Sequence, residues 1–262
     1  MTDTITTLLR DGFILVFNQD RLDIVRTAEA LMQAGIGNME VTCRISQPLE
    51  KLARLRQELP GFVTGAASLI DRPRILATYN KRHASDPLPS VGQAVDAGAQ
   101  YIVSAATFRP ATYRRYAGKL PIIPGCGTVG EIVSQYSLGA NLVKIFPAEQ
   151  LGGPAFVKAV DPAIHKTISL VPTGGTNPAN IPDYIAAGVL VLGGSFSCID
   201  KAVFAEIVER QDYARLAAEL TAVKRLIDER RAERWPSLDF AAAPVEQIAE
   251  ATGRDFNLSR EG

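Results

Sequence analysis

The sequence predicts an α/β protein, and more specifically a (β/α)₈ TIM barrel with a long connection after the third strand and an extra helical extension at the C-terminus. Short apolar runs typical of buried strands alternate with amphipathic helical patterns along most of the chain. Eight such runs are present, and the helices between them supply the crossovers that parallel strands require. An open, doubly wound sheet is the alternative, but no strand is followed by a GxGxxG turn.

The expected strands are short and apolar, and several end at a glycine, a proline or a polar turn. They cover residues 13–17, 38–44, 62–66, 101–104, 121–123, 142–146, 168–172 and 189–192. Eight parallel strands with intervening helices close naturally into a barrel, with the helices as an outer ring.

Helices are expected between these strands because the gaps carry start and stop signals. Asp20 is the expected cap of the first helix, and Pro48 lies at the start of the second. Thr128 and Glu131 fit a capping box, so both are interpreted as helix-start residues rather than as catalysts. Asn177 precedes a proline, a pair that is typical of a helix start.

Two parts fall outside the regular alternation. The connection over residues 69–95 is long, with a short helical piece at 75–81 and a polar loop at 83–90. Residues 213–262 are predicted to form a helical extension, packed on the 1–212 barrel or on a neighbouring subunit. Leu216, Leu220, Val223 and Ile227 make an apolar stripe on its first helix, and a second helix is possible at 244–252.

Composition excludes several classes of protein. The chain has 262 residues, 47% of them apolar, and a formal net charge of zero, so neither nucleic acid nor a membrane surface is an expected partner. There is no apolar run long enough to span a membrane, and the N-terminus is too polar for a signal peptide. A cytoplasmic protein is expected. Cys43, Cys126 and Cys198 are too widely spaced for a metal site, and an odd count argues against a disulfide framework.

A lysine interrupts the sixth strand. Lys144 lies within the apolar run 142–146, which ends at Pro147. One interpretation is that the strand has a solvent-facing side and Lys144 points outward. In the other, apolar surroundings disfavour the ammonium form, so that part of the lysine is a free amine able to form a Schiff base with a carbonyl.

The second strand carries charged residues on one face. Glu40, Thr42 and Arg44 share that face because side chains alternate along a strand. If the face points into the barrel, a carboxylate and a guanidinium enter its interior together, near the strand ends where barrel enzymes place their active sites. A solvated ion pair on the outside is the alternative. Lys144 and Phe146 likewise share one face of the sixth strand.

Glycine pairs follow the last two strands, in Thr173-Gly174-Gly175 and in Gly193-Gly194-Ser195. Loops at these two positions, with exposed backbone N–H groups, form the usual phosphate site of a (β/α)₈ barrel. The alternative is that the glycines only permit tight turns. Two such pairs at neighbouring strand ends favour a phosphorylated ligand.

These motifs together resemble the 2-keto-3-deoxy-6-phosphogluconate (KDPG) aldolase family, which includes 4-hydroxy-2-oxoglutarate aldolases, over residues 13–202. The motifs are Met39-Glu40-Val41-Thr42-Cys43-Arg44, Pro124-Gly125-Cys126-Gly127-Thr128, Val143-Lys144-Ile145-Phe146-Pro147-Ala148-Glu149 with Gly152-Gly153, Pro172-Thr173-Gly174-Gly175 and Gly193-Gly194-Ser195. The resemblance implies a class I aldolase that requires no metal or organic cofactor, and a homotrimer.

The resemblance also implies roles for individual residues. Lys144 would form the Schiff base and Glu40 would act as acid and base. The implied substrate-binding residues are Arg44 for the carboxylate, Ser68 and Phe146 for the pyruvyl part, and Thr173, Gly174, Gly175, Gly194 and Ser195, the last four of them for the phosphate.

The chain departs from the family pattern in ways that affect the substrate. The family usually has Gly-Ala-Gly-Thr after the third strand, whereas this chain has Gly65-Ala66-Ala67-Ser68. Ser104-Ala105-Ala106 replaces the usual Ser-Pro after the fourth strand, and Leu15 replaces a proline in the first. The connection at 69–95 and the tail have no usual counterpart.

The expected reaction is reversible cleavage of KDPG to pyruvate and glyceraldehyde 3-phosphate. The alternatives are an aldolase for 4-hydroxy-2-oxoglutarate or 2-keto-3-deoxy-6-phosphogalactonate, and a sugar-phosphate-binding barrel without catalysis. No cluster of histidines and carboxylates favours a metal-dependent aldolase. His83, His165 and Cys126 are interpreted as non-catalytic.

Overall fold

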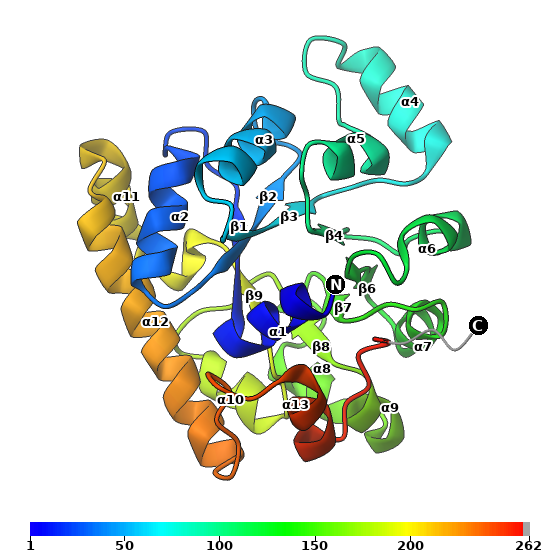
Figure 1. The fold of residues 1–262 in the computed structure, drawn as a ribbon, viewed down its shortest axis with the longest axis vertical. Coiled ribbons are helices and arrows are strands. Elements are labelled where there is room, and N and C mark those ends of the chain that lie inside the picture. The colour runs from blue at the N-terminus through cyan, green and yellow to red at the C-terminus, as the bar shows by residue number, and fades with distance from the viewer. Residues whose placement is uncertain (259–262) are drawn as a thin grey trace.

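Nine short strands, paired in parallel throughout, form the centre of the protein in the computed structural model, which describes residues 1–258 (Figure 1). The strands are β1 (Phe13–Phe17), β2 (Asn38–Thr42), β3 (Val63–Ala67), β4 (Tyr101–Val103), β5 (Ile122–Ile123), β6 (Gly125–Cys126), β7 (Val143–Ile145), β8 (Leu170–Pro172) and β9 (Leu192–Gly194). One sheet has the order β5-β4-β3-β2-β1-β9 and the other has the order β6-β7-β8. The predicted α/β class with parallel strands is confirmed.

Helices alternate with the strands and surround them. The helices are α1 (Thr2–Asp11), α2 (Ile24–Gln33), α3 (Pro48–Glu58), α4 (Pro73–Arg82), α5 (Val91–Asp96), α6 (Pro110–Tyr116), α7 (Val129–Ser137), α8 (Pro154–Ala159), α9 (Pro162–Thr167), α10 (Ile181–Ala186), α11 (Lys201–Arg210), α12 (Tyr213–Arg234) and α13 (Val245–Thr252), with a 3₁₀ turn η1 (Phe196–Cys198). None of the helices in residues 1–258 is both long and apolar enough to cross a membrane.

The two sheets meet at Pro124 and at a single bridge between Thr173 and Gly193. Pro124 lies between β5 and β6, where the prediction had one strand over 121–123. A proline has no N–H to donate to a neighbouring strand, so the ladder is interrupted there. The Pro124 carbonyl still accepts a hydrogen bond from the Lys144 backbone N–H at 2.9 Å, which ties the segment to β7.

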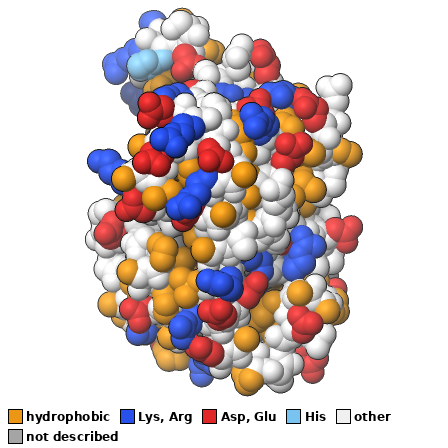
Figure 2. All heavy atoms as spheres, turned by 90° about the vertical axis from the view of Figure 1, so that its left-hand side faces the viewer, with side chains coloured by type: hydrophobic (Ala, Val, Ile, Leu, Met, Phe, Trp, Pro, Cys, Tyr) orange, Lys and Arg blue, Asp and Glu red, His pale blue; other side chains and the backbone are white. Residues whose placement is uncertain are grey.

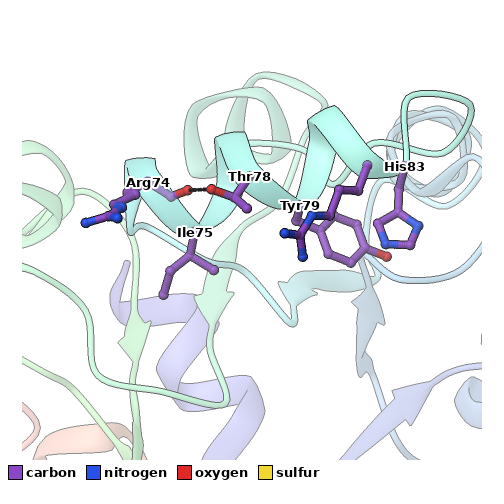
Figure 3. Close-up of a pocket in the computed structure, with 6 residues that line it drawn as sticks. Arg74, Ile75, Thr78, Tyr79 and His83 are labelled. Atoms are coloured by element: carbon purple, nitrogen blue, oxygen red, sulfur yellow. Dashed lines mark hydrogen bonds between the residues drawn. The ribbon is translucent and has the colours of Figure 1, made fainter.

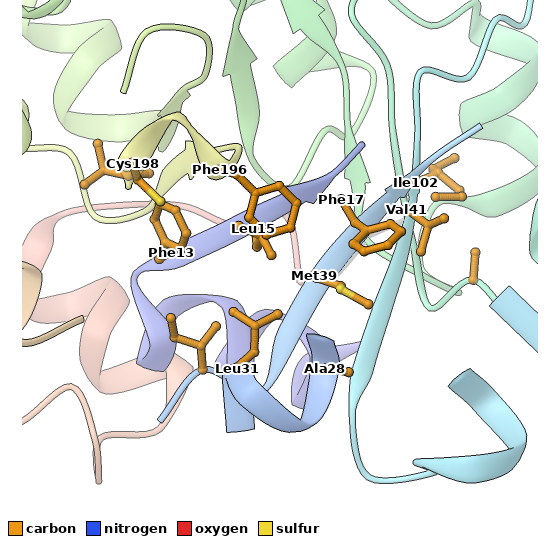
Figure 4. Close-up of a cluster of buried hydrophobic side chains, with 14 of the residues drawn as sticks. Phe13, Leu15, Phe17, Ala28, Leu31, Met39, Val41, Ile102, Phe196 and Cys198 are labelled. Atoms are coloured by element: carbon orange, nitrogen blue, oxygen red, sulfur yellow. The ribbon is translucent and has the colours of Figure 1, made fainter. Parts of the chain in front are cut away.

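Alternation along β1 divides its side chains between two hydrophobic clusters. Phe13, Leu15 and Phe17 point to the outer layer, where they pack with Leu31 of α2 and Met39 of β2 (Figure 4). Complete burial of one such side chain contributes about 1.5–3 kcal/mol. Ile14 belongs to the other cluster, which also contains Val171 and Leu142. Because side chains alternate along a strand, the uninterrupted apolar run of β1 supplies both clusters.

An N-terminal helix that the sequence analysis did not predict closes part of the inner cluster. Ile5, Leu8 and Leu9 of α1 are buried in that cluster, together with Ile248 of α13. The helix ends at Gly12, whose φ of 67° is easily adopted only without a Cβ. Polar residues between these apolar positions obscure the helical pattern in the sequence.

Several predicted helix and strand ends need correction. Asp23, not Asp20, caps α2 by accepting a hydrogen bond from the Arg26 N–H. Asp20 instead contacts Ser46 and Lys51. The last strand begins at Leu192 and not at residue 189, because its hydrogen bonds are set by pairing with β1.

Two predicted caps have different outcomes. The capping box of Thr128 and Glu131 at the start of α7 is confirmed. Asn177 does not cap a helix directly: α10 follows Asn180 and begins at Ile181. The prediction placed that helix start a few residues early because Asn177-Pro178 begins a turn that precedes the helix.

The connection between β3 and β4 contains the predicted helical piece. It forms α4, which extends away from the body of the protein and has no buried residue. Arg74, Ile75 and Thr78 line one side of α4, and the rings of Tyr79 and His83 stack at 4.2 Å between centroids (Figure 3). The helix is therefore held by its own hydrogen bonds and by two hydrogen bonds between the Asn80 amide and the Leu88 backbone, both 2.9 Å, rather than by a core of its own.

Helix α12 lies against α2 and α10. Its predicted apolar stripe is buried: Leu216, Leu220, Val223 and Ile227 join the main hydrophobic cluster. The face of the protein that includes α11 and α12 shows basic and acidic side chains interspersed (Figure 2), with ion pairs such as Lys224–Asp228 one helical turn apart. The predicted helix at 244–252 is present as α13, which contacts α1.

Candidate active site

A cavity of about 310 Å³ opens at the carboxyl ends of the strands of both sheets. It is lined by Val16, Glu40, Thr42, Arg44, Ser68, Leu69, Ile70, Ser104, Ala105, Ala106, Lys144, Phe146 and Thr173. Six of the predicted site residues therefore line one cavity, although they come from four separate segments of the chain: Glu40, Arg44, Ser68, Lys144, Phe146 and Thr173. The carboxyl ends of parallel strands are the usual location of ligand sites in α/β folds.

Lys144 and Glu40 form a buried ion pair in this cavity. The Nζ atom of Lys144 on β7 lies 2.8 Å from Oε1 of Glu40 on β2. Lys144 is 6% exposed and Glu40 is 2% exposed. The interpretation in which Lys144 points to solvent is therefore excluded, and so is the one in which Glu40 lies on an outer, solvated face.

The pair has a specific chemical capacity. Burial disfavours both charged forms, and only the close contact between the two groups offsets that cost. Transfer of one proton from the ammonium to the carboxylate leaves a free amine next to a carboxylic acid. An amine in this state can attack a carbonyl carbon, and the acid beside it can return the proton to an oxygen that must leave as water.

Arg44 lies just beyond the end of β2 at the mouth of the cavity. Its Nε donates to the Oγ of Ser68 at 3.0 Å, and Ser68 is held with a left-handed φ of 59°. Arg44 forms no ion pair with any carboxylate of residues 1–258. Its two terminal nitrogens are therefore available to bind a carboxylate in bidentate fashion.

Apolar side chains form the rest of the cavity wall. The Phe146 ring centroid lies 5.7 Å from Nζ of Lys144, and Leu69 and Ile70 cover a neighbouring part. Ser104 accepts a hydrogen bond from the Ala106 N–H at 3.0 Å, which turns the backbone after β4. The sequence analysis did not single out Leu69, Ile70 or Val16 as site residues, because an apolar residue after a strand looks the same whether it lines a cavity or a core.

The two glycine turns lie next to the cavity but do not line it. Gly174 and Gly175 have φ of 92° and 83°, and a Cβ on Gly174 would lie 3.5 Å from the Phe146 ring. The bridge between Thr173 and Gly193 brings the second turn, with Gly194 and Ser195, beside the first. Of the predicted substrate-binding residues, these four glycine and serine positions are thus adjacent to the cavity, and Thr173 is on its wall.

The carbonyl of Gly175 is held by two asparagines that the sequence analysis did not assign to the site. Asn177 Nδ2 and Asn180 Nδ2 donate to this oxygen at 2.9 and 2.8 Å, and Asn180 Oδ1 accepts from the Asn177 N–H at 3.0 Å. Within the described chain, the N–H groups of Gly175 and Thr176 donate to no protein acceptor. Two backbone donors are thereby left available for an anion.

The residues interpreted as non-catalytic lie elsewhere. His83 follows α4 and His165 is on α9, and neither lines the cavity. Cys43, Cys126 and Cys198 are buried, and desolvation raises the pKa of each thiol to about 12, so none is a thiolate near neutral pH. Residues 1–258 contain no group of three or more histidine, cysteine or acidic side chains placed to hold a metal ion.

Comparison with known sequences gives a consistent set of relatives. Residues 87–218 match the family described as KDPG and KHG aldolase. A 2-dehydro-3-deoxy-phosphogluconate aldolase of Pseudomonas aeruginosa is 34% identical over 236 residues, which cover 88% of this chain and 96% of the relative. A KHG/KDPG aldolase of Escherichia coli is 31% identical over 193 residues, covering 73% of this chain and 80% of the relative.

Solved structures of similar fold include aldolases of the same kind. A KDPG aldolase from Legionella pneumophila, with pyruvate captured as a covalent carbinolamine intermediate, superposes with a TM-score of 0.68 at 25% identity. It covers 85% of this chain and 98% of its own. The native KDPGal structure superposes with a TM-score of 0.64 over 83% of this chain and 94% of its own, at 21% identity, a likeness that concerns the fold alone.

Proposed function

The chain belongs to the KDPG and KHG aldolase family, and we propose that it is a class I aldolase, an aldehyde-lyase, that reversibly cleaves KDPG to pyruvate and glyceraldehyde 3-phosphate. The observation that carries this proposal is the buried contact of 2.8 Å between Lys144 and Glu40 inside a cavity that also contains Arg44. An amine, an acid/base group and a carboxylate-binding group are the components that Schiff-base cleavage of a keto acid needs.

The first half of the reaction forms the Schiff base. The Lys144 amine attacks the C2 carbonyl carbon of the keto acid, and the resulting carbinolamine loses its hydroxyl as water. Glu40, at 2.8 Å from Nζ, accepts the proton that the amine gives up and delivers one to the departing hydroxyl. The product is a protonated imine on Lys144, which attracts electrons from the neighbouring carbons.

The second half breaks the C3–C4 bond. Glu40 takes the proton of the C4 hydroxyl, directly or through a water, and the electron pair of the breaking bond moves into the imine. The aldehyde leaves and an enamine remains on Lys144. Protonation of the enamine at C3 and hydrolysis of the imine then release pyruvate and regenerate the free lysine.

Substrate binding is assigned to the groups around this pair. Arg44, oriented by Ser68 at 3.0 Å, binds the carboxylate, and Phe146 packs on the pyruvyl part. The turns with Gly174, Gly175, Gly194 and Ser195 bind the phosphate at the far end of the substrate, supported by their position next to the cavity and by the free N–H groups of the first turn.

We also propose that the two sheets together form a closed (β/α)₈ barrel, in which β5 and β6 count as one strand interrupted at Pro124. The bridge between Thr173 and Gly193 and the pairing of β1 with β9 support this closure. The division between a barrel at 1–212 and an extension at 213–262 stays a prediction, and the contacts of α12 with α2 and α10 favour packing on the barrel over packing on a neighbour. The homotrimer and the cytoplasmic location also stay predictions.

A second candidate substrate is 4-hydroxy-2-oxoglutarate, which has no phosphate. It is supported by Ala105 and Ala106, which line the cavity where the family pattern has a proline and so leave room for a different aldehyde part. The phosphogalactonate epimer of KDPG and a sugar-phosphate-binding barrel without catalysis are the remaining alternatives. The intact Lys144–Glu40 pair argues against loss of catalysis. Competition by inorganic phosphate separates the phosphorylated substrates from 4-hydroxy-2-oxoglutarate.

The test is borohydride reduction of the protein in the presence of pyruvate, followed by intact-mass measurement and peptide mapping. We expect one pyruvyl adduct, located on Lys144, and none in a Lys144→Ala variant. A folded wild-type protein that gives no adduct, or gives one on another lysine, would contradict the proposal. Steady-state cleavage of KDPG and of 4-hydroxy-2-oxoglutarate then identifies the preferred substrate.

A further inference from the structure

Glu40 lies in a row of inward-facing positions that crosses three neighbouring strands. In the register of the first sheet, Glu40 of β2 pairs with Gly65 of β3, and Gly65 pairs with Tyr101 of β4. Paired residues of neighbouring strands project to the same side of a sheet. The side chains of Glu40 and Tyr101 therefore flank a position that has no side chain.

The Tyr101 ring occupies the space that a side chain at position 65 would need. A Cβ on Gly65 would lie 2.2 Å from Cε2 and 2.3 Å from Cζ of Tyr101, far inside the closest approach of two carbon atoms. The φ of Gly65 is not in the left-handed region, so the glycine is needed for space and not for its backbone conformation. The ring thus lies across β3 and extends toward β2.

The far end of the ring reaches β2 directly below Glu40. The Tyr101 hydroxyl donates to Oδ1 of Asn38 at 3.4 Å, and Asn38 precedes Glu40 by two positions on the same face of the strand. Asn38 Nδ2 in turn donates to Asp11 Oδ2 at 2.8 Å and to the Phe13 carbonyl at 2.9 Å. Tyr101, Asn38 and Asp11 are each 0% exposed.

The negative charge of Glu40 also acts on the Tyr101 phenol. Burial raises the pKa of Tyr101 well above its ordinary value, and the negative charges of Glu40 and Asp11 raise it further. The phenol therefore stays protonated and acts as a donor, and it adds no charge beneath the ion pair. The space below the Glu40 carboxylate is filled by a neutral ring that is fixed at both ends.

We propose that Tyr101 is a positioning residue that forms the floor under Glu40 and holds its carboxylate against Nζ of Lys144. This inference rests on the proposed function, because it assumes that Glu40 transfers protons there. Removal of the ring would open space at Gly65 into which the carboxylate could turn and water could enter. A displacement of about 1 Å is enough to lower a rate about a hundredfold. Arg44, beyond the end of β2, and Phe146, after β7 of the other sheet, belong to other parts of the cavity wall.

The test compares Tyr101→Leu, Tyr101→Phe and a control, Tyr113→Leu, in the full-length protein. Tyr113 is also a buried tyrosine with a hydrogen-bonded hydroxyl, to Gln135 at 2.8 Å, but it lies in the outer cluster. We expect Tyr101→Leu to lower kcat for the preferred keto acid at least tenfold with KM within threefold of wild type. Tyr101→Phe, which keeps the ring, should stay within threefold in both, and Tyr113→Leu should lower the melting temperature without this loss in kcat.

A double-mutant cycle distinguishes action through Glu40 from a general structural effect. In a Glu40→Gln background, Tyr101→Leu should lower the residual rate less than twofold, because the carboxylate that the ring positions is gone. Full additivity, or equal losses in Tyr101→Leu and Tyr113→Leu, would overturn the inference while leaving the proposed function intact. A wild-type protein that cleaves no keto acid would remove the proposed function itself. If Tyr101→Leu does not fold, the same criteria apply to Tyr101→Met, whose unbranched side chain adapts more easily to an irregular space.

Discussion

At the scale of single residues, the Lys144–Glu40 pair couples chemistry to stability. Each group is buried, and each is tolerated only because the other lies 2.8 Å away. Arg44 and Ser68 add a second polar contact at the cavity mouth. A site of this kind holds charged groups that the surrounding apolar wall would otherwise exclude, so substitutions in it affect both turnover and folding.

We predict that Lys144→Met abolishes turnover and lowers the free energy of unfolding by about 3–5 kcal/mol, because it leaves the Glu40 carboxylate buried without a partner. Adding Glu40→Gln should restore most of that stability, because glutamine carries no charge, and should restore no activity. Urea unfolding and a cleavage assay on the three proteins check this. Turnover within tenfold of wild type in Lys144→Met would contradict the role of the lysine.

A second prediction at this scale concerns His165. Its Nε2 donates to the Ala187 carbonyl, and burial, with the nearby charges of Arg254, Arg234 and Lys166, lowers the pKa of His165 below the ordinary value of 6.5. The folded state keeps the imidazole neutral while the unfolded chain takes up a proton below about pH 6.5. Stability from this group is therefore complete above pH 6.5 and is lost as the pH falls toward the folded pKa.

The pH dependence of unfolding in urea checks this prediction. Between pH 7 and pH 5.5, wild type should lose up to about 1.4 kcal/mol per pH unit from this one group. His165→Gln keeps a side-chain donor near the Ala187 carbonyl and should lose less. His83→Gln, at the stacked and exposed histidine after α4, is the matched control and should behave as wild type. Identical slopes in all three proteins would show that His165 does not titrate as described.

At the scale of elements, the turn between β8 and α10 carries part of the phosphate site that we propose. The glycines permit its backbone conformation, and the amides of Asn177 and Asn180 hold the Gly175 carbonyl away from the free N–H groups. If the peptide group between Gly175 and Thr176 flipped, its carbonyl oxygen would take the place of an N–H in the proposed phosphate site. That oxygen would repel a phosphate.

We therefore predict that Asn180→Ala raises KM for a phosphorylated keto acid about tenfold, equivalent to about one charge-assisted hydrogen bond. KM for 4-hydroxy-2-oxoglutarate should change less than twofold, because this substrate has no phosphate to bind. The ratio of the two KM values is the measurement, and it is insensitive to partial unfolding. An equal rise for both substrates would mean that Asn180 supports the site as a whole rather than the phosphate turn.

At the scale of the whole molecule, the C-terminal region is part of the hydrophobic interior. Helix α12 contributes Leu216, Leu220, Val223 and Ile227 to the main cluster, and α13 contributes Ile248 to the inner one beside α1. Arg231 of α12 is 1% exposed and donates to the Leu9 carbonyl at the end of α1. The first and last helices of the chain thus lie together over the same part of the sheet assembly.

We predict that a chain ending at residue 212 does not fold to the native state, because it exposes the surface that α12 covers between α2 and α10. Each of the four buried aliphatic side chains contributes about 1.5–3 kcal/mol, which in sum is comparable to the whole stability of a domain. Circular dichroism and solubility of residues 1–212, compared with the full chain and with residues 1–242, provide the check. A cooperative, native-like 1–212 fragment would show instead that the extension is an independent addition.

The sequence by itself determined the elements whose signals are local. An uninterrupted apolar run placed β1 at the predicted residues, and the capping box at Thr128 and Glu131 marked the start of α7, because neighbouring residues encode apolar runs and capping directly. The glycine pairs and the lysine in an apolar strand likewise predicted which residues to examine for function.

Only the tertiary structure decided which of these residues meet. Lys144 and Glu40 are 104 positions apart, and their contact depends on the register of strands in two sheets, which no local pattern encodes. The same holds for the Tyr101 ring across Gly65 and for α12 beside α2. Long-range pairing is set by how the whole interior packs, because each buried charge and each bulky ring must find its space among residues brought together by the fold.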